Sequence, residues 1–306
     1  MVIGVLVEIS FERRWVAACT VMLLLCTSGC ADVLGRSNSE QVDTTESSVE
    51  PDPNAAYLLS AFYGLDDDLP PLGRLLVCDG ERGDDGMPVV FSTELDLSTL
   101  QAGDFLVALA DGSNGSLTCV TPAPAFDEGE LRTMLMVGDF GSSENPPVSV
   151  VIQGNLLSLD GASNYRGASV SVTPLEDGPS LVHAEQVPEA EWALGRPSTR
   201  FPFGGGSGCP ESTRQVVRVT WNGGVTKPGG DEIDDVEREA YRVLFESGEE
   251  MAPMAVADLG DGDNNHELCL ESDTPVRRVS FPAGLLTDPR EDLNPATSVA
   301  LGTHGS

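Results

Sequence analysis

Residues 146–158 read PPVSVVIQGNLLS, and residues 275–287 read PVRRVSFPAGLLT. Both stretches run from proline through alternating apolar positions to two leucines and a hydroxyl residue. Self-similarity at a fixed spacing is the signature of a duplicated structural unit. The sequence therefore predicts two similar domains in succession, with a boundary near Gly178. A constant offset of 129 residues relates Val150 to Val279, Leu156 to Leu285 and Val170 to Val299.

Further matches extend the duplication towards the N-terminus of each half. An offset of 136 in one block indicates an insertion in the second copy, around residues 228–237. Several blocks that match in the same order are hard to obtain by chance. The pairs are 90–92 with 219–221, 105–107 with 241–243, 122–127 with 253–258, and 59–61 with 182–184.

Apolar residues alternate with polar ones in short runs, and Asp-Gly, Asn-Gly and Pro-Pro pairs separate these runs. Short strands with regularly spaced turn signals are typical of a β-sandwich or barrel. Long amphipathic helical patterns are missing, and the best helical candidate is 231–245, where at most a turn or two of helix is expected. The sequence therefore predicts an all-β protein.

Each half resembles the bacterial immunoglobulin-like (Ig-like) domains of S-layer proteins, adhesins and exported enzymes. The resemblance lies in 89–100 and 104–107 of the first half and in 283–289 of the second. The Gly-Asn that usually follows this last motif is absent, and 290–295 stands in its place. The resemblance implies two tandem Ig-like β-sandwiches, at 55–178 and 179–306. Such domains serve as spacers, as adhesive modules or as accessories to catalytic domains.

The first thirty residues have the layout of a secretory signal. Arg13 and Arg14 precede the apolar run 15–26, and the small residues 27–29 lead to Cys30. A charged start, a short apolar core and small residues define an export signal. The whole resembles a bacterial lipoprotein signal, although Thr27 stands where an aliphatic residue is usual.

That resemblance implies a lipid-modified Cys30 and a place in the cell envelope, at the outer membrane or the periplasmic face. The alternative is an ordinary cleaved signal. Residues 31–54 are rich in Ser, Thr, Asp and Glu and contain no aromatic residue. Such a composition cannot bury enough apolar surface to become ordered. We predict a flexible linker at 31–54.

The formal net charge is −32, from 17 Lys and Arg against 49 Asp and Glu. This balance argues against nucleic-acid binding, which needs cations to neutralise phosphate. It suits a solvated surface and divalent cations.

Four cysteines remain after the signal and Cys30 are set aside: Cys78, Cys119, Cys209 and Cys269. An even number in an exported chain predicts disulfides. Three connectivities are open. One bridge within each half, Cys78–Cys119 and Cys209–Cys269, is preferred because it keeps each bridge inside a domain.

The densest polar constellation lies at 258–267. Asp258, Asp261, Asp263 and Asn265 could turn their oxygens towards a hard cation, and calcium takes six to eight oxygen ligands. The pattern is not an EF-hand, because the sixth position is His266 and the twelfth is Ser272. The alternative is a tight acidic turn without a metal, since Asp, Asn and Gly favour turns.

No catalytic constellation is recognisable. Nucleophilic catalysis needs a base beside Ser or Cys, and His183, His266 and His304 show no such arrangement. The sequence predicts no enzyme activity and no organic cofactor. It favours a lipid-anchored envelope protein with a structural, adhesive or protein-interaction role, whose partner is a protein or a glycan. The alternatives are a calcium-stabilised carbohydrate- or protein-binding module and a hydrolase with a site built from loops.

Overall fold

A computed structural model describes most of the chain, namely residues 37–38, 42–67, 84–125, 127–192, 194, 208–260 and 262–302. The predicted signal 1–30 with Cys30, and also Cys78 and Asp261, lie outside the described residues. Within these ranges the regular structure is strand, apart from one α-helix and three short 3-10 helices. The all-β prediction is confirmed. None of the described helices is both long and apolar enough to span a membrane.

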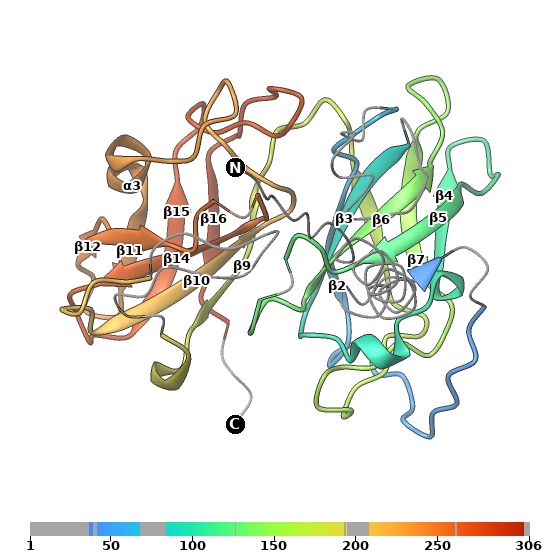
Figure 1. Cartoon of the computed structure of the whole chain (residues 1–306), viewed down its shortest axis with the longest axis horizontal. Helices are drawn as coiled ribbons and strands as arrows, with labels where there is room; N and C mark the ends of the chain where they lie inside the picture. Colours follow the sequence, from blue (N-terminus) through green and yellow to red (C-terminus); the bar gives the residue numbers. More distant parts are fainter. Residues whose placement is uncertain are drawn as a thin grey trace, which may run out of the picture.

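The first half holds eight strands and two of the 3-10 helices (Figure 1). They are β1 (Ser37–Asn38), β2 (Leu58–Phe62), β3 (Asp85–Phe91), η1 (Leu97–Thr99), η2 (Ala102–Asp104), β4 (Phe105–Leu109), β5 (Ser116–Thr121), β6 (Thr133–Asp139), β7 (Pro147–Ile152) and β8 (Ser169–Thr173).

The second half holds the other eight described strands, with the short helix inside the predicted range 231–245. Asp234 caps this helix by accepting from Val236 N, and Glu237 completes a capping box. The elements are β9 (Leu181–Gln186), η3 (Glu189–Glu191), β10 (Gln215–Trp221), α3 (Asp235–Ala240), β11 (Arg242–Phe245), β12 (Glu250–Met251), β13 (Ala255–Ala257), β14 (Asn265–Leu270), β15 (Val276–Phe281) and β16 (Thr297–Ala300).

The two halves repeat one strand order. In the first half β5-β6-β3-β2 and β8-β7-β4 are neighbours within an eight-stranded sheet that also includes β1 at its edge. In the second half β13-β14-β10-β9 and β12-β11-β15-β16 form two four-stranded sheets. Each strand of the first series has a counterpart at the same place in the second, and β12 is an addition. The predicted boundary near Gly178 falls between β8 and β9.

The halves differ in how their two sheets meet. In the first half a short parallel ladder between β2 and β8 pairs Ala61 with Val172 and joins everything into one sheet. In the second half β9 and β16 pack together without such a ladder. There the Gly302 amide donates to the Ala184 carbonyl at 2.8 Å. One duplicated order thus gives one continuous sheet and one pair of separate sheets.

Strand register supports the predicted duplication in one of the two strand series. Val150 pairs with Val107 and Val170, and Val279 pairs with Val243 and Val299. These are the offsets of 136 and 129 found in the sequence.

Two of the predicted matches are wrong. Val89 pairs with Ala61 as Val219 pairs with Ala184, so 90–92 is displaced by one residue from the true counterpart of 219–221. A slip of one residue moves every side chain to the other face. The match of 122–127 with 253–258 also fails, because the first stretch follows β5, whereas the second contains β13, the counterpart of β5.

Each half has its own hydrophobic core, built around aromatic side chains. In the first half Phe91 meets Tyr165 edge to face, with ring centroids 5.1 Å apart. In the second half Trp221 meets Phe281 in the same way at 5.5 Å. Trp221 is fully buried and its indole N–H donates to the Tyr241 hydroxyl at 3.1 Å, as a buried Trp requires. Trp221 is therefore part of the second core.

Residues 42–54 are ordered, so the prediction of a flexible linker is wrong for this segment. Thr44 N donates to the Gln101 side chain at 3.0 Å, and the Asn155 side chain donates to Thr45 O at 2.8 Å. The Asn164 side chain donates to Val49 O at 3.0 Å. Composition alone describes apolar burial, whereas these residues are held by polar partners distant in the sequence.

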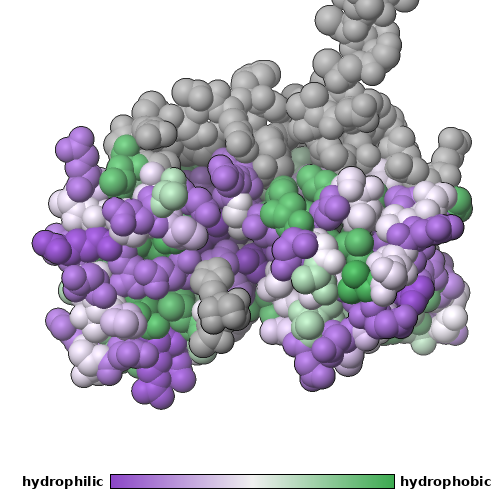
Figure 2. All heavy atoms as spheres, turned by 90° about the horizontal axis from the view of Figure 1, so that it is seen from below, coloured by the Kyte–Doolittle hydropathy of each residue, from purple (hydrophilic) through white to green (hydrophobic). Residues whose placement is uncertain are grey.

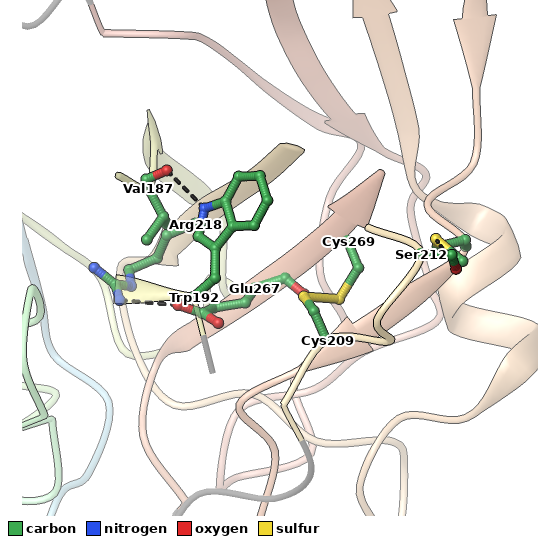
Figure 3. The surroundings of a disulfide bond; sticks show 8 residues. Val187, Trp192, Cys209, Ser212, Arg218, Glu267 and Cys269 are labelled. Atoms are coloured by element: carbon green, nitrogen blue, oxygen red, sulfur yellow. Dashed lines mark hydrogen bonds and ion pairs between the residues drawn. A yellow bond between two sulfur atoms is a disulfide. The ribbon is translucent and has the colours of Figure 1, made fainter. Parts of the chain in front are cut away.

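Polar side chains cover much of the molecular face in Figure 2, with the hydrophobic ones in separate groups. A disulfide joins Cys209 to Cys269, as predicted (Figure 3). It lies in a small apolar cluster with Val187 and Trp192, outside the main core. Cys119 is disulfide-bonded as well, to a partner outside the described residues. Each half therefore carries a disulfide cysteine on a strand of the same sheet series, Cys119 on β5 and Cys269 on β14.

Removing the Cys209–Cys269 bond by the double change to serine should lower the free energy of unfolding by about 4 kcal/mol. This is the loop-closure estimate for a sequence separation of 60 residues. Urea denaturation of the full chain measures it, with the oxidised wild type as reference. A change below about 1 kcal/mol would contradict a structural role for the bond.

Asp104 should make stability fall as the pH rises. Its side chain is buried, and this burial, opposed by a hydrogen bond from Gln101 N and assisted by the charge of Asp43, raises its pKa to about 7. Between pH 4 and 7 the folded state keeps a proton that the unfolded state has lost, so folding weakens towards pH 7. Asp104→Asn should flatten this slope and exceed the wild type in stability above pH 7. The exposed control Asp177→Asn should keep the wild-type slope; parallel profiles for all three proteins would contradict the assignment.

Candidate functional site

A row of charged residues crosses the sheet of the second half where it faces the first. Arg218 on β10 lies opposite Glu185 on β9 and Glu267 on β14. Because side chains alternate along a strand, Val217 and Val219 face the core and Arg218 faces outwards. The outward side is covered too, since all seven residues of β10 are buried. The first half provides this cover.

An arginine from each half binds acceptors of the other half. Arg132 lies just before β6 and donates to the Glu185 carboxylate at 2.7 Å. Arg218 donates to the carbonyl oxygens of Gly129 at 3.0 Å and Glu128 at 3.2 Å. It also donates to Glu267 at 2.9 Å (Figure 3).

We call the buried set of Glu130, Arg132, Glu185, Arg218 and Glu267 the junction network. None of its members is more than 8% exposed. Charge-assisted hydrogen bonds of this kind are short and directional. The reciprocal pattern therefore fixes the angle between the two halves as well as their contact.

The carboxyl groups of the junction network have pKa values that are shifted in different directions by their surroundings. Burial by itself would raise the pKa of Glu185, but a hydrogen bond from His183 and the charge of Arg132 outweigh it and lower the pKa to about 2. Burial raises the pKa of Glu267 despite the neighbouring Arg218. Burial also raises the pKa of Glu130 well above its usual value, and the charges of Asp263 and Asp258 add to this. Glu185 is thus the most firmly ionised of the three.

Beside the junction network the two halves also pack closely, so their surfaces are complementary in shape as well as in charge. Gly223 lies against the Phe62 ring of the first half, where a Cβ atom would come within 2.6 Å of a ring carbon. Only glycine fits this approach without displacing the ring. Next to it the Asn264 side chain donates to Trp221 O at 2.6 Å and to Thr133 Oγ1 of the first half at 3.2 Å.

A pocket of about 460 Å³ opens beside the junction network. Its lining comes from both halves and combines carboxylates, hydroxyls, a histidine and an arginine. Ser158 and Ala162 N already donate to Asp160 there, and Leu131 N donates to Glu94. The polar lining residues are Ser92, Thr93, Glu94, Arg132, Ser158, Asp160, His183 and Glu185.

The structure brings together only part of the predicted calcium site. Asp258, at a left-handed backbone position with φ 62°, lies near the buried Asp263. Burial and the charge of Asp258 raise the pKa of Asp263 to about 7. Asn265 is used otherwise, because its side-chain oxygen accepts from Thr220 at 2.8 Å and its amide donates to Asp263. Asp261 lies outside the described residues.

A second acidic group occurs in the first half, where Asp66, Asp67 and Asp85 offer oxygens within 4.8 Å of one another. The buried Asp85 accepts from Asp67 N at 2.9 Å and from Phe140 N at 2.6 Å. Tyr63 donates to Asp66 at 3.2 Å. The acidic group is therefore explained by a structural role, because its hydrogen bonds hold the backbone segments next to β3 in place.

The two described histidines lie in different surroundings, one in the second core and one at the junction pocket. His266 is buried, which lowers its pKa to about 4, and its Nδ1 is 2.7 Å from the Tyr241 hydroxyl. It belongs to the second core. His183 is 3.5 Å from Glu185 and lines the junction pocket. His304 lies outside the described residues.

The junction network could not be predicted from the sequence. Arg218 stands between two valines, and Glu267 lies in a run that is otherwise mostly apolar, which reads as a solvent-facing position of a strand. Nothing in one sequence distinguishes a charge facing water from a charge facing another domain. The one feature of the sequence that could have indicated the network is that Arg218 and Glu267 interrupt predicted strands that are otherwise largely apolar.

No family model and no curated protein matches this chain. Among solved structures it is similar to the N-terminal part of the bacterial S-layer protein SbsC, with a TM-score of 0.26 and 10% identity. The similarity covers 81% of this chain and 44% of that one, so the match spans less than half of the length of that N-terminal part.

Replacing Arg218 by methionine should destabilise the protein by about 3–5 kcal/mol, because Glu267 and Glu130 would remain buried without their cation. The exposed Arg278→Met is the control and should stay within about 0.5 kcal/mol of the wild type. Urea denaturation measures both. Equal effects of the two changes would show that the junction network contributes nothing specific.

Proposed function

We propose that this chain is a lipid-anchored cell-envelope protein in which two Ig-like β-sandwiches form one rigid contact module. Its role is structural, adhesive or protein-interacting, and it has no catalytic activity. The observation that carries this proposal is the junction network. The most extensive buried polar constellation among the described residues lies where two duplicated units meet, and it holds their relative orientation.

The strand order supports the Ig-like assignment. The Ig constant-type sandwich has strands ABED in one sheet and CFG in the other. Taking β2 to β8 as A to G, the first half has β2-β3-β6-β5 and β4-β7-β8 as neighbours. The second half has β9-β10-β14-β13 and β11-β15-β16, with β12 beside β11. Both series match, although the sequences of the halves have diverged.

Rigidity supports a contact role. Buried ion pairs often contribute little net stability compared with apolar packing, but they can make one arrangement specific. Here Arg132 and Arg218 bind across the junction in both directions. A module that presents surfaces at a fixed angle suits a spacer or an adhesive unit. The partner would be a protein or a glycan of the envelope, and the strong acidity of the chain disfavours nucleic acid.

The N-terminal sequence supports the anchor. The charged residues Arg13 and Arg14, the apolar run and the small residues before Cys30 lead to a cysteine suited to lipid attachment. Several acyl chains hold firmly, because each buried CH₂ contributes about 0.8 kcal/mol. The outer membrane or the periplasmic face is the proposed location.

A hydrolase is the second candidate, and the junction pocket is the observation that favours it. Glu94, Asp160 and Glu185 bring three carboxylates to its lining, and paired carboxylates serve acid–base chemistry. Glu185 is committed to Arg132, and Asp160 already accepts two hydrogen bonds. This leaves Glu94, whose pKa burial raises, as the acid. Turnover of chromogenic esters or glycosides that disappears in Glu94→Gln would favour the hydrolase over the contact role.

Radiolabelled palmitate should enter the wild-type chain in cells and fail to enter Cys30→Ala. The matched control Cys26→Ala, four residues away within the predicted signal, should label normally. The Cys30→Ala protein should be recovered without the membrane fraction. An unlabelled, soluble wild type would contradict the anchor and favour the ordinary cleaved signal.

The contact role has a separate test. A photo-reactive amino acid placed at exposed Tyr57 or Val148 should yield discrete adducts of higher mass after irradiation of intact cells. Buried Tyr63 is the control position and should yield none. Free chain alone from both exposed positions would count against these surfaces as contact surfaces.

A further inference from the structure

The junction pocket lies at the boundary between two structural units, which is a common place for ligand sites. Its volume of about 460 Å³ falls within the range of about 300–1,000 Å³ that is usual for pockets that bind small ligands. Glu94, Arg132 and Asp160 line it from the first half. His183 and Glu185 line it from the second half. A ligand bound there would contact both halves.

Two carboxylates of the pocket lining keep acceptor capacity. Glu94 Oε1 accepts from Leu131 N at 3.3 Å. Asp160 Oδ1 accepts from Ser158 Oγ at 2.6 Å and from Ala162 N at 2.9 Å. The second oxygen of each carboxylate has no hydrogen bond to a described residue, although a carboxylate offers about four lone-pair sites. Both groups can therefore accept hydrogen bonds from a ligand.

One donor of the pocket lining also lacks a partner. Arg132 is 5% exposed, and its terminal nitrogens donate to Glu185 at 2.7 Å and to Ser92 O at 3.1 Å. Its Nε has no hydrogen-bond partner among the described residues. A buried donor without a partner is costly. An acceptor supplied from the pocket, directly or through a bridging water, would satisfy this nitrogen.

These groups together select the chemistry of the ligand. A cation would suit Glu94 and Asp160, but it would meet the guanidinium of Arg132. An anion would meet both carboxylates. A neutral hydroxyl group donates and accepts at once, so several such groups can serve all three residues. Leu159 also lines the pocket and is 53% exposed, so it offers an apolar surface for the C–H face of a sugar ring.

We propose that the junction pocket binds one neutral sugar unit of an envelope glycan. Glu94, Asp160 and Arg132 hold its hydroxyl groups, and Leu159 packs against its ring. This inference rests on the proposed contact role and assigns the partner to the glycan class. It differs from the hydrolase candidate, because the sugar is bound and not cleaved. Since both halves line the pocket, a ligand that binds only the folded chain also stabilises their junction.

The test uses the full chain in detergent and an array of neutral oligosaccharides built from hexoses and N-acetylhexosamines. At least one of them should bind, and calorimetric titration with that saccharide should show one site per chain and leave the saccharide intact. The double change Glu94→Gln and Asp160→Asn should weaken binding at least tenfold, because it replaces two charged acceptors. Its melting midpoint without saccharide should stay close to that of the wild type, since neither side chain belongs to a buried residue.

The matched control is the double change Asp111→Asn and Glu144→Gln, which removes the same charge from exposed positions of the first half. Asp111 resembles Asp160, because it too accepts from a serine hydroxyl at 2.6 Å. The control protein should bind the saccharide with the affinity of the wild type. Should the double variant in the pocket not fold, Asp160→Asn alone, at an exposed position, decides by the same titration.

The proposal is overturned if no saccharide of the array binds, if the pocket variant keeps the wild-type affinity, or if the control loses affinity equally. An acetylated tri-arginine peptide that binds the wild type but not the pocket variant would overturn it in favour of a cationic protein segment. Release of reducing sugar would overturn it in favour of hydrolysis. Adducts that form in cells while no saccharide binds would leave the contact role in place with a protein as the partner.

Discussion

The ion-paired row of Glu185, Arg218 and Glu267 is the constraint on which the arrangement of this protein depends. Charges on the outer face of a sheet normally face water. Here they face another part of the same chain, and once buried they must find partners of opposite sign. The first half supplies Arg132 and the carbonyl oxygens of Glu128 and Gly129. These hydrogen bonds and ion pairs therefore fix the orientation of the two halves relative to each other.

The two halves repeat one strand order but differ in the contacts that hold their sheets together. One strand order is used twice, yet a ladder between β2 and β8 closes the first half while β9 and β16 only pack together. Each half places a disulfide cysteine on the same series of strands, but Cys119 lies on β5 and Cys269 on β14. The two halves therefore share their strand order, but they differ in the β-ladder and in the strand that carries the disulfide cysteine.

Much of the fold could be predicted from the sequence, because alternation and turn residues report local geometry directly. The all-β class and the short helix near residue 235 followed from such patterns, and the Cys209–Cys269 bond followed from the even number of cysteines and the division into two halves. Register was harder: the irregularities at Leu58–Ser60 and Thr220–Trp221 shift the pairing in ways that letter matching cannot detect. The site was harder still. Arg218 reads as solvent-facing until the other half is in place, and residues 42–54 read as disordered until Gln101, Asn155 and Asn164 are brought beside them.

The ordered N-terminal segment limits how far the protein can reach. Ser37 already pairs with Val120 of β5, and 42–54 follow the surface of the first half. If Cys30 carries the lipid anchor as proposed, the chain length between Cys30 and Ser37 limits the distance between these two residues to at most about 25 Å. The first half would then lie close to the bilayer surface and could move only a short distance away from it. Any partner would have to come to the membrane surface to meet it.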